Sequence, residues 1–153
     1  METKNIKYPY LPPDRSILYV PKDNRYILAA KKMAEEFSTD KKNPTGAVII
    51  NKNGDILISA SNQSVLKNKF LLNTHKNWCI RKLFKISSGQ KYWLCPGCAS
   101  SKYHAESLAV GKAKNMGVSI SGCDLYLLGH WWCCKPCWDK MISAGIKNVY
   151  LTK

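Results

Sequence analysis

The stretch from Asp124 to Leu151, DLYLLGHWWCCKPCWDKMISAGIKNVYL, contains three predicted elements in succession. Asp124–Leu128 is a short apolar run typical of a buried strand, and Asn148–Leu151 is a second one. Between them, Lys135–Ala144 is predicted to be a helix, closed by a glycine. A strand, a helix and a strand in this order predict a right-handed crossover between two parallel strands. The stretch therefore indicates an α/β fold.

The preceding part of the chain supplies the other elements of this fold. Apolar residues recur at helical spacing over residues 24–37 and predict an amphipathic helix. The apolar segments 45–50 and 55–60 flank an Asn53-Gly54 turn and predict an antiparallel hairpin. A further helix is predicted over residues 104–115. Together these elements predict a three-layer α/β/α sandwich built on a mixed sheet.

Two segments do not fit the pattern of regular elements. Residues 1–22 are rich in proline and predict an extended arm that packs over the domain. Residues 64–103 show no clean period and are predicted to form an insert, which would be hard to hold in order without secondary structure. A chain of 153 residues is the size of one domain, so we expect residues 1–153 to fold as a single unit.

The charge of the chain is strongly positive. The net charge is +14, and lysines are dense between Lys67 and Lys102. Such a surface attracts nucleotides or nucleic acid, although a lysine-biased composition explains it equally well. No apolar stretch is long enough to span a membrane, and residues 1–16 lack the apolar run of a secretory signal. We therefore expect a cytoplasmic protein with no membrane partner, in which seven cysteines bind metal or act in catalysis rather than form disulfides.

Two motifs at predicted helix starts suggest a zinc site. Cys134-Lys-Pro-Cys137 lies where a strand gives way to a helix, and His104 begins the other helix. One histidine and two cysteines leave a fourth tetrahedral position open, which is the arrangement of a catalytic zinc. Glu106 is too close to His104 to bind the same metal easily, but its carboxylate can reach a metal-bound water. The alternative is a structural zinc completed by a fourth cysteine, with Glu106 on the surface.

The same motifs carry a family resemblance. His104-Ala105-Glu106 with Cys134-x-x-Cys137 resembles the H-x-E…P-C-x-x-C signature of the zinc-dependent cytidine and deoxycytidylate deaminases. The segments PTGAVII from Pro44 and CKPCWDKMISAGIKNVYL from Cys134 are similar to the deoxycytidylate (dCMP) deaminases, and the similarity covers roughly residues 24–63 and 98–152. The chain departs from the signature at Cys133, where the family has proline, and we interpret Cys133 as a packed free thiol.

The resemblance implies a zinc-dependent hydrolase that converts dCMP to dUMP and ammonia. Glu106 would transfer the protons, and Thr45, Asn62 and Ala105 would contact the substrate. Trp131 and Trp132 either stack on the base or anchor the loop against the sheet. The residues alone further predict a hydrogen-bonded loop histidine at position 130 and a core cysteine at position 123.

A second cluster of potential ligands lies in the insert. His75-x3-Cys79 precedes Cys95-Pro-Gly-Cys98, and four such ligands would close a structural zinc site. Some dCMP deaminases similarly hold an extra zinc before the HAE motif. The alternative is that Cys79 is simply buried and His75 is a surface residue. We predict two zinc ions for each chain, one catalytic and one structural.

The sequence leaves alternatives open for the substrate and for the assembly of the chain. The base could belong to RNA or single-stranded DNA, with the insert binding the backbone. A non-catalytic zinc module that binds nucleic acid is another possibility, although Glu106 argues against it. Because the chain ends after Asn148–Leu151, without the fifth strand common in the family, that strand is predicted to leave an open edge. We expect a homo-oligomer that covers the edge, unless the arm of residues 1–22 covers it.

Overall fold

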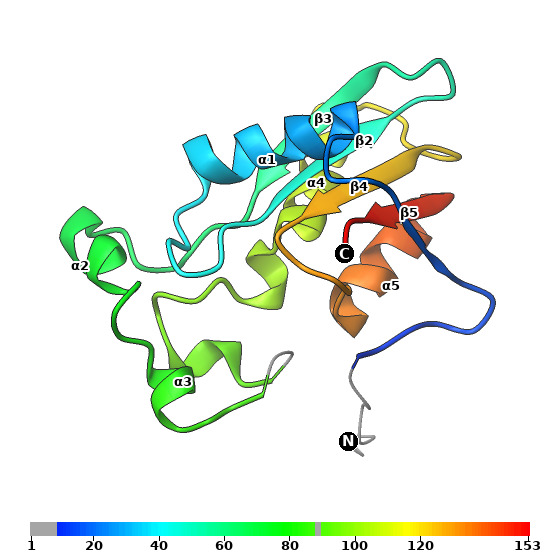
Figure 1. Cartoon of the computed structure of the whole chain (residues 1–153). Helices are drawn as coiled ribbons and strands as arrows, with labels where there is room; N and C mark the ends of the chain where they lie inside the picture. Colours follow the sequence, from blue (N-terminus) through cyan, green and yellow to red (C-terminus); the bar gives the residue numbers. More distant parts are fainter. Residues whose placement is uncertain (1–8, 88–89) are drawn as a thin grey trace.

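The computed structural model describes residues 9–87 and 90–153 (Figure 1). In chain order the elements are β1 (Ile17–Tyr19), α1 (Arg25–Phe37), β2 (Gly46–Ile50), β3 (Ile56–Ser61), α2 (Lys69–Thr74), α3 (Ile80–Leu83), the 3₁₀ turns η1 (Tyr92–Leu94) and η2 (Ser101–Tyr103), α4 (Ala105–Asn115), β4 (Asp124–Leu128), α5 (Lys135–Ser143) and β5 (Asn148–Leu151). The predicted hairpin, crossover and long helices are all present. Residues 1–8 of the predicted arm and 88–89 of the insert lie outside the described residues.

The described strands form one mixed sheet in the order β1-β5-β4-β2-β3. The hairpin β2–β3 is antiparallel, and β2 also pairs antiparallel with β4. The crossover through α5 makes β4 and β5 parallel, with Leu125 opposite Val149. The predicted mixed sheet is therefore confirmed.

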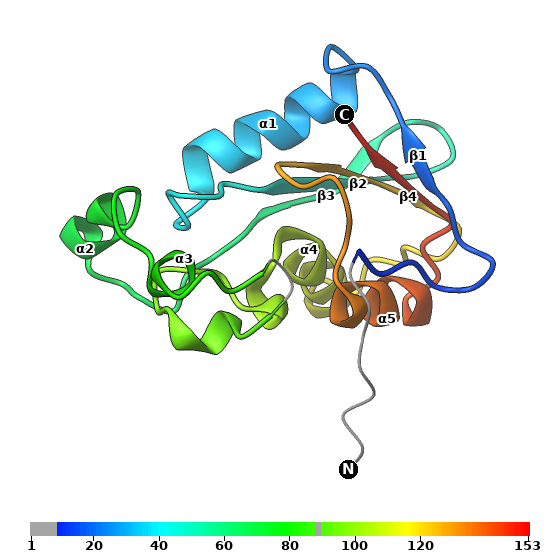
Figure 2. The same cartoon turned by 60° about the horizontal axis from the view of Figure 1, so that its bottom comes forward.

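Helices cover both faces of the sheet (Figure 2). Val48 and Ile50 of β2 point to one face, where they pack with Ile27 and Ala30 of α1. Their neighbours Ala47 and Ile49 point to the opposite face and join the larger core beneath α4 and α5. This alternation follows from the period of two residues in a strand. The predicted three-layer α/β/α sandwich is confirmed.

Gly46 lets α1 lie directly against the sheet. A Cβ atom at this position would come 1.9 Å from the carbonyl oxygen of Ala30 and 2.9 Å from the backbone nitrogen of Ala34. Both contacts involve backbone, so no side-chain movement could relieve them. A larger residue would push α1 away from β2, and with it the segment after α1 that leads into the candidate site.

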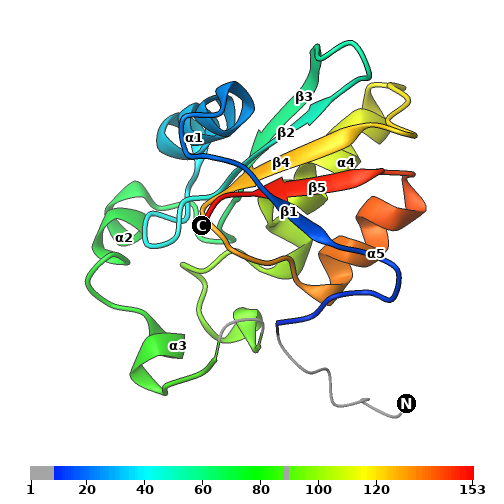
Figure 3. The same cartoon turned by 45° about the vertical axis from the view of Figure 1, so that its right-hand side comes forward.

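The outer edge of β5 is covered by β1. Ile17 pairs with Val149 and Tyr19 with Leu151 in parallel register (Figure 3). The expectation of an open edge at residues 148–151 is therefore wrong, and the alternative, that the N-terminal arm covers it, is confirmed. Three residues, Ile17, Leu18 and Tyr19, are too few to show a strand period, which explains why the sequence indicated only an extended arm.

The insert folds as short helical pieces beside one end of the sandwich, drawn in green in Figure 1. The pieces α2, α3, η1 and η2 contain between three and six residues each. Segments this short cannot display a helical hydrophobic period, so the insert appears aperiodic in the sequence although it contains secondary structure. Among the described residues, no helix is long and apolar enough to cross a bilayer.

Candidate metal centre and active site

The residues preceding α4 and α5 come together on one face of the sheet. His104 is the N-cap residue of α4 and Cys134 is that of α5, both in extended conformation, and the two helices contact each other. Pro136 lies in the first turn of α5, where its missing N–H costs no hydrogen bond. Cys137 then lies one turn beyond Cys134, so both sulfurs face the same point.

The predicted histidine ligand lies at the distance from both predicted cysteine ligands that a zinc ion requires. The Nδ1 atom of His104 lies 3.5 Å from the Sγ atoms of both Cys134 and Cys137. Tetrahedral zinc with ordinary Zn–N and Zn–S bonds separates such nitrogen and sulfur ligands by about 3.5 Å. The two sulfurs are 3.1 Å apart, and all three side chains are buried.

The surroundings prepare the ligand atoms for a metal. The Nε2 atom of His104 lies 3.2 Å from the carbonyl oxygen of Ala99, which can only accept, so Nε2 carries the hydrogen and Nδ1 keeps its lone pair. The hydrogen bond that Cys134 shares with Cys137 lowers the pKa of the Cys134 thiol to about 5, and His104 acts in the same direction. A thiolate is the metal-binding form of cysteine. The donor set therefore fits zinc.

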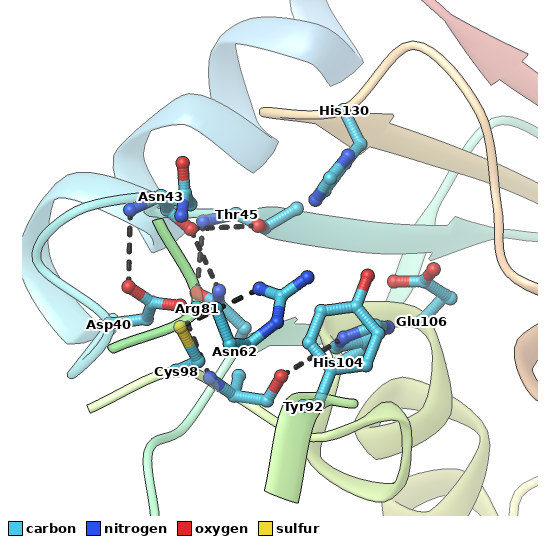
Figure 4. A pocket seen from close by; sticks show the side chains of 11 residues that line it. Asp40, Asn43, Thr45, Asn62, Arg81, Tyr92, Cys98, His104, Glu106 and His130 are labelled. Atoms are coloured by element: carbon cyan, nitrogen blue, oxygen red, sulfur yellow. Dashed lines mark hydrogen bonds between the residues drawn. The ribbon is translucent and has the colours of Figure 1, made fainter. Parts of the chain in front are cut away.

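Glu106 lies in the first turn of α4 and is 4% exposed. Burial raises the pKa of its carboxyl group above the ordinary value, and the nearby His104 imidazole opposes this effect. A carboxyl group with a raised pKa is suited to accept and return a proton near neutral pH. Glu106 lines a cavity of about 70 Å³. Its side chain points toward the other labelled residues of that cavity (Figure 4).

The insert contains the second predicted cluster, fully assembled. The Nε2 atom of His75 lies 3.5 Å from Cys95 Sγ and 3.7 Å from Cys98 Sγ, and Cys79 Sγ lies 3.5 Å from Cys98 Sγ. All four residues are buried, so the alternative of a surface His75 is wrong. Three sulfurs and one imidazole nitrogen supply the four donors that a structural zinc takes.

A short chain of contacts joins the two clusters. The carboxylate of Asp40 lies 3.7 Å from His75 Nδ1 through Oδ1 and accepts a hydrogen bond from Ala99 N through Oδ2 at 3.2 Å. The carbonyl oxygen of Ala99 in turn contacts His104. Ala99 also directly follows Cys98, so one residue links a ligand of the second cluster to a ligand of the first.

A comparison with protein families identifies the family to which the chain belongs. Residues 20–153 match the family described as cytidine and deoxycytidylate deaminase zinc-binding region. The chain belongs to this deaminase family. The matched span contains the insert and both clusters, which agrees with the resemblance seen in the sequence.

Solved structures of a phage dCMP deaminase share the fold of this chain at low sequence identity. The dCMP deaminase of cyanophage S-TIM5 is 23% identical in its apo form and 22% identical in its complex with dCMP and dUMP, with TM-scores of 0.50 and 0.51. The matches cover 82% of this chain and 78% and 76% of the phage chains. A diaminohydroxyphosphoribosylaminopyrimidine deaminase/5-amino-6-(5-phosphoribosylamino)uracil reductase from Thermotoga maritima is 20% identical with a TM-score of 0.49, and the match covers 82% of this chain but only 28% of that one. A comparison with curated protein sequences gave no match.

Two of the predicted substrate contacts, Thr45 and Asn62, line the cavity. Asn62 is held from several directions, because its Oδ1 accepts a hydrogen bond from Thr45 N at 2.9 Å and its Nδ2 donates to Asn43 O at 2.8 Å. Ser38 Oγ donates to the same Oδ1 atom. The amide therefore has a fixed orientation before any ligand arrives.

The other predicted contacts lie in different surroundings. Trp132 is 5% exposed and lines a second, smaller cavity together with His104, Glu106 and Cys134. Its neighbour Trp131 is 57% exposed and does not line the cavity. Ala105 is fully buried in the main core, as are the two cysteines that were expected to be packed, Cys123 and Cys133.

Several cavity residues were not predicted from the sequence. His130, expected to be a hydrogen-bonded loop residue, lines the cavity with its ring centroid 6.4 Å from that of His104. Burial and the nearby charges of His104 and Arg81 lower the pKa of His130 to about 4, so its ring is neutral at pH 7. Arg81 and Tyr92 reach the cavity from the insert. The only signal for Arg81 in the sequence was the high density of cationic residues in that segment.

Proposed function

We propose that this deaminase removes the exocyclic amine of a cytosine nucleotide, with dCMP as the substrate and dUMP and ammonia as the products. The observation that carries the proposal is the Glu106 carboxyl group, which faces a cavity shared with His104 beside the Cys134–Cys137 pair. A closed structural site would need no buried acid at that position. The fold shared with a phage dCMP deaminase supports the choice of nucleotide.

The residues divide the chemistry between them. His104, Cys134 and Cys137 would hold the zinc, which lowers the pKa of a bound water to near 7. Glu106 accepts the proton released as the water oxygen adds to C4 of the base, and then delivers protons to N3 and to the departing amine. Water is consumed, the C4–N4 bond breaks, and ammonia leaves. Burial raises the pKa of the Glu106 carboxyl group, which favours its uptake of the proton.

We propose that the base lies between two sides of the cavity. Thr45 directly precedes β2 and Asn62 directly follows β3, whereas His130 and Trp132 come from the loop after β4. The oriented amide of Asn62 supports a polar contact, and the aromatic rings support stacking. We keep Ala105 as a proposed contact because it directly precedes Glu106 at the helix start.

We further propose two zinc ions for each chain, the second bound by His75, Cys79, Cys95 and Cys98. The supporting observation is that four buried ligand atoms lie within 4.8 Å of one another. This ion would act structurally, because all its positions are filled by protein atoms. Residues 1–153 would then form a single deaminase domain, and its seven unpaired cysteines support a cytoplasmic location.

A second candidate substrate is a cytosine base within RNA or single-stranded DNA. Large apolar side chains of the insert are strongly exposed, namely Phe70, Leu83, Phe84 and Trp93, at 66% to 78%. Exposed lysines such as Lys69 and Lys85 lie next to them in the sequence. Exposed aromatics among cations are typical of surfaces that bind single strands.

Ammonia release measured across dCMP, cytidine, cytosine and single-stranded oligonucleotides tests these proposals. The dCMP proposal predicts the highest kcat/KM for dCMP. A preference for the oligonucleotides would favour the second candidate. An enzyme that releases no ammonia from any of the four, although fully loaded with zinc, would contradict both.

A further inference from the structure

Arg81 occupies an unusual place for a cation. It belongs to the short helix α3 of the insert, yet its side chain is 8% exposed and forms part of the wall of the catalytic cavity (Figure 4). The same cavity contains His104 and Glu106. The insert therefore delivers a positive charge to the site where the reaction takes place.

The partners of Arg81 fix its orientation, and among them Cys98, as a thiolate, offsets part of its charge. Nε donates to the carbonyl oxygen of Gln90 at 2.9 Å, and Nη2 donates to that of Ser87 at 3.0 Å. Nη1 lies 3.7 Å from Cys98 Sγ, and the guanidinium carbon lies 4.3 Å from the centre of the Tyr92 ring. Within residues 9–87 and 90–153, no carboxylate oxygen lies within 4.0 Å of this guanidinium.

A buried guanidinium that no carboxylate pairs with favours the binding of a further anion. Asp40, a carboxylate in the same cavity, is already engaged, because its oxygens accept from the backbone N–H groups of Lys42, Asn43 and Ala99. On each terminal nitrogen of Arg81, one N–H group remains outside the contacts above. A planar pair of N–H donors matches the oxygens of a phosphate group.

We propose that Arg81 binds the 5′-phosphate of the nucleotide substrate, so that the insert determines the preference for a nucleotide over a nucleoside. This inference rests on the proposed function and specifies one of its residues. Tyr92 and the backbone carbonyl groups of Ser87 and Gln90 preorganise the guanidinium, which reduces the entropy lost when the phosphate binds. The competing explanation is that Arg81 only stabilises the insert and the thiolate of Cys98.

Binding of the product without turnover separates these explanations. Isothermal titration calorimetry would compare dUMP with deoxyuridine on the zinc-loaded wild type, R81Q and R81K. The neighbouring K82Q is a matched control, because Lys82 is exposed and does not line the cavity. Zinc content and the thermal midpoint would show that each variant keeps the insert folded.

The proposal predicts that R81Q weakens dUMP binding by about 10- to 100-fold, the range for lost charge-assisted hydrogen bonds. Deoxyuridine binding should change less than about 2-fold, R81K should lie in between, and K82Q should match the wild type. An equal loss for dUMP and deoxyuridine, or unchanged dUMP binding in R81Q, would overturn the proposal. If R81Q weakened the binding of a uridine-containing oligonucleotide but not the binding of dUMP, the assignment to a monophosphate would be overturned.

Two different results would contradict the role of Arg81 and the proposed function. A wild type that deaminates dCMP and deoxycytidine with equal kcat/KM would overturn the role of Arg81 and leave the deaminase proposal standing. A wild type that deaminates no cytosine nucleotide would contradict the proposed function itself. If R81Q does not fold, R81K alone decides, because it keeps the charge and loses the paired donors.

Discussion

At the scale of single residues, Glu106 is an acidic side chain in surroundings that disfavour its charge. Its burial raises the pKa of the carboxyl group, and the neighbouring His104 partly offsets this. The geometry fixes its place beside the candidate metal ligands, since it lies two residues after His104 on the first turn of α4. The role of Glu106 can therefore be separated from that of the ligands by substitution.

Glu106→Gln should retain zinc and the fold while lowering turnover by about 100- to 10,000-fold, the usual contribution of a general acid–base. Cys134→Ser should instead lose the catalytic zinc. Turnover and metal content measured on the same preparations give the comparison. Glu35→Gln, on the exposed face of α1, is the matched control and should behave like the wild type. Near wild-type turnover in the Glu106 variant would show that the carboxylate does not transfer the protons.

Gly97 shows how closely the second cluster is packed. A Cβ atom at this position would come 2.4 Å from Cδ2 of the His75 ring, and His75 is completely buried. We expect Gly97→Ala to displace the imidazole and weaken zinc binding at this cluster by about 10- to 100-fold, as changes in the support of metal ligands do. Competition with a chromophoric chelator measures this affinity. Gly111→Ala is the control, because nothing lies within 4 Å of its added methyl group. Unchanged affinity in Gly97→Ala would mean that His75 is not a ligand.

At the scale of elements, the candidate site combines two parts of different origin. The beginnings of α4 and α5 supply the catalytic ligands, and the insert supplies the second cluster and Arg81. Asp40 and Ala99 connect the two parts, because Asp40 contacts His75 and Ala99, and Ala99 contacts His104. We therefore expect changes in the insert to reach the catalytic cluster.

The double variant Cys95→Ser/Cys98→Ser should contain about one zinc per chain, whereas the wild type should contain about two. We also expect the remaining zinc to bind about 10-fold more weakly, because Ala99, which orients His104, follows Cys98. Metal analysis and chelator competition measure both values. Cys123→Ser, a core cysteine outside both clusters, should keep two zinc ions. A wild type with one zinc, unchanged in the double variant, would rule out the second site.

The sequence predicted those parts of the site whose spacing is local. His104 and Glu106 are two residues apart and Cys134 and Cys137 three, so their joint placement follows from helix geometry. Arg81 and Tyr92 could not be placed in this way, because their position depends on the path of about forty residues folded as short pieces. The strand β1 was missed for a related reason, since its pairing with β5 is a long-range contact of three residues.

At the scale of the whole molecule, β1 changes the expectation for assembly. The predicted homo-oligomer rested on an open β5 edge, and β1 covers that edge from the same chain. A homo-oligomer stays a prediction, but an open β5 edge no longer supports it. The described outer edges of the sheet are instead β1 and β3.

Deleting residues 1–20 removes β1 and should expose the backbone of β5, together with part of the core around Val149 and Leu151. We expect the truncated chain to self-associate at micromolar concentration and to unfold at a lower temperature than the full chain. Static light scattering and thermal unfolding measure the two effects. A truncated chain with the same mass and thermal midpoint as the full chain would show that the β1–β5 pairing contributes little to the folded state.

The most direct test of the central claim is the rate of ammonia release from dCMP by the zinc-loaded protein, measured beside the Glu106→Gln variant. The account predicts stoichiometric formation of dUMP and ammonia by the wild type. It predicts loss of that activity on zinc removal, recovery on zinc addition, and a deep loss in the Glu106 variant at equal zinc content. No ammonia from dCMP with fully zinc-loaded protein, or equal rates in the wild type and the variant, would contradict it.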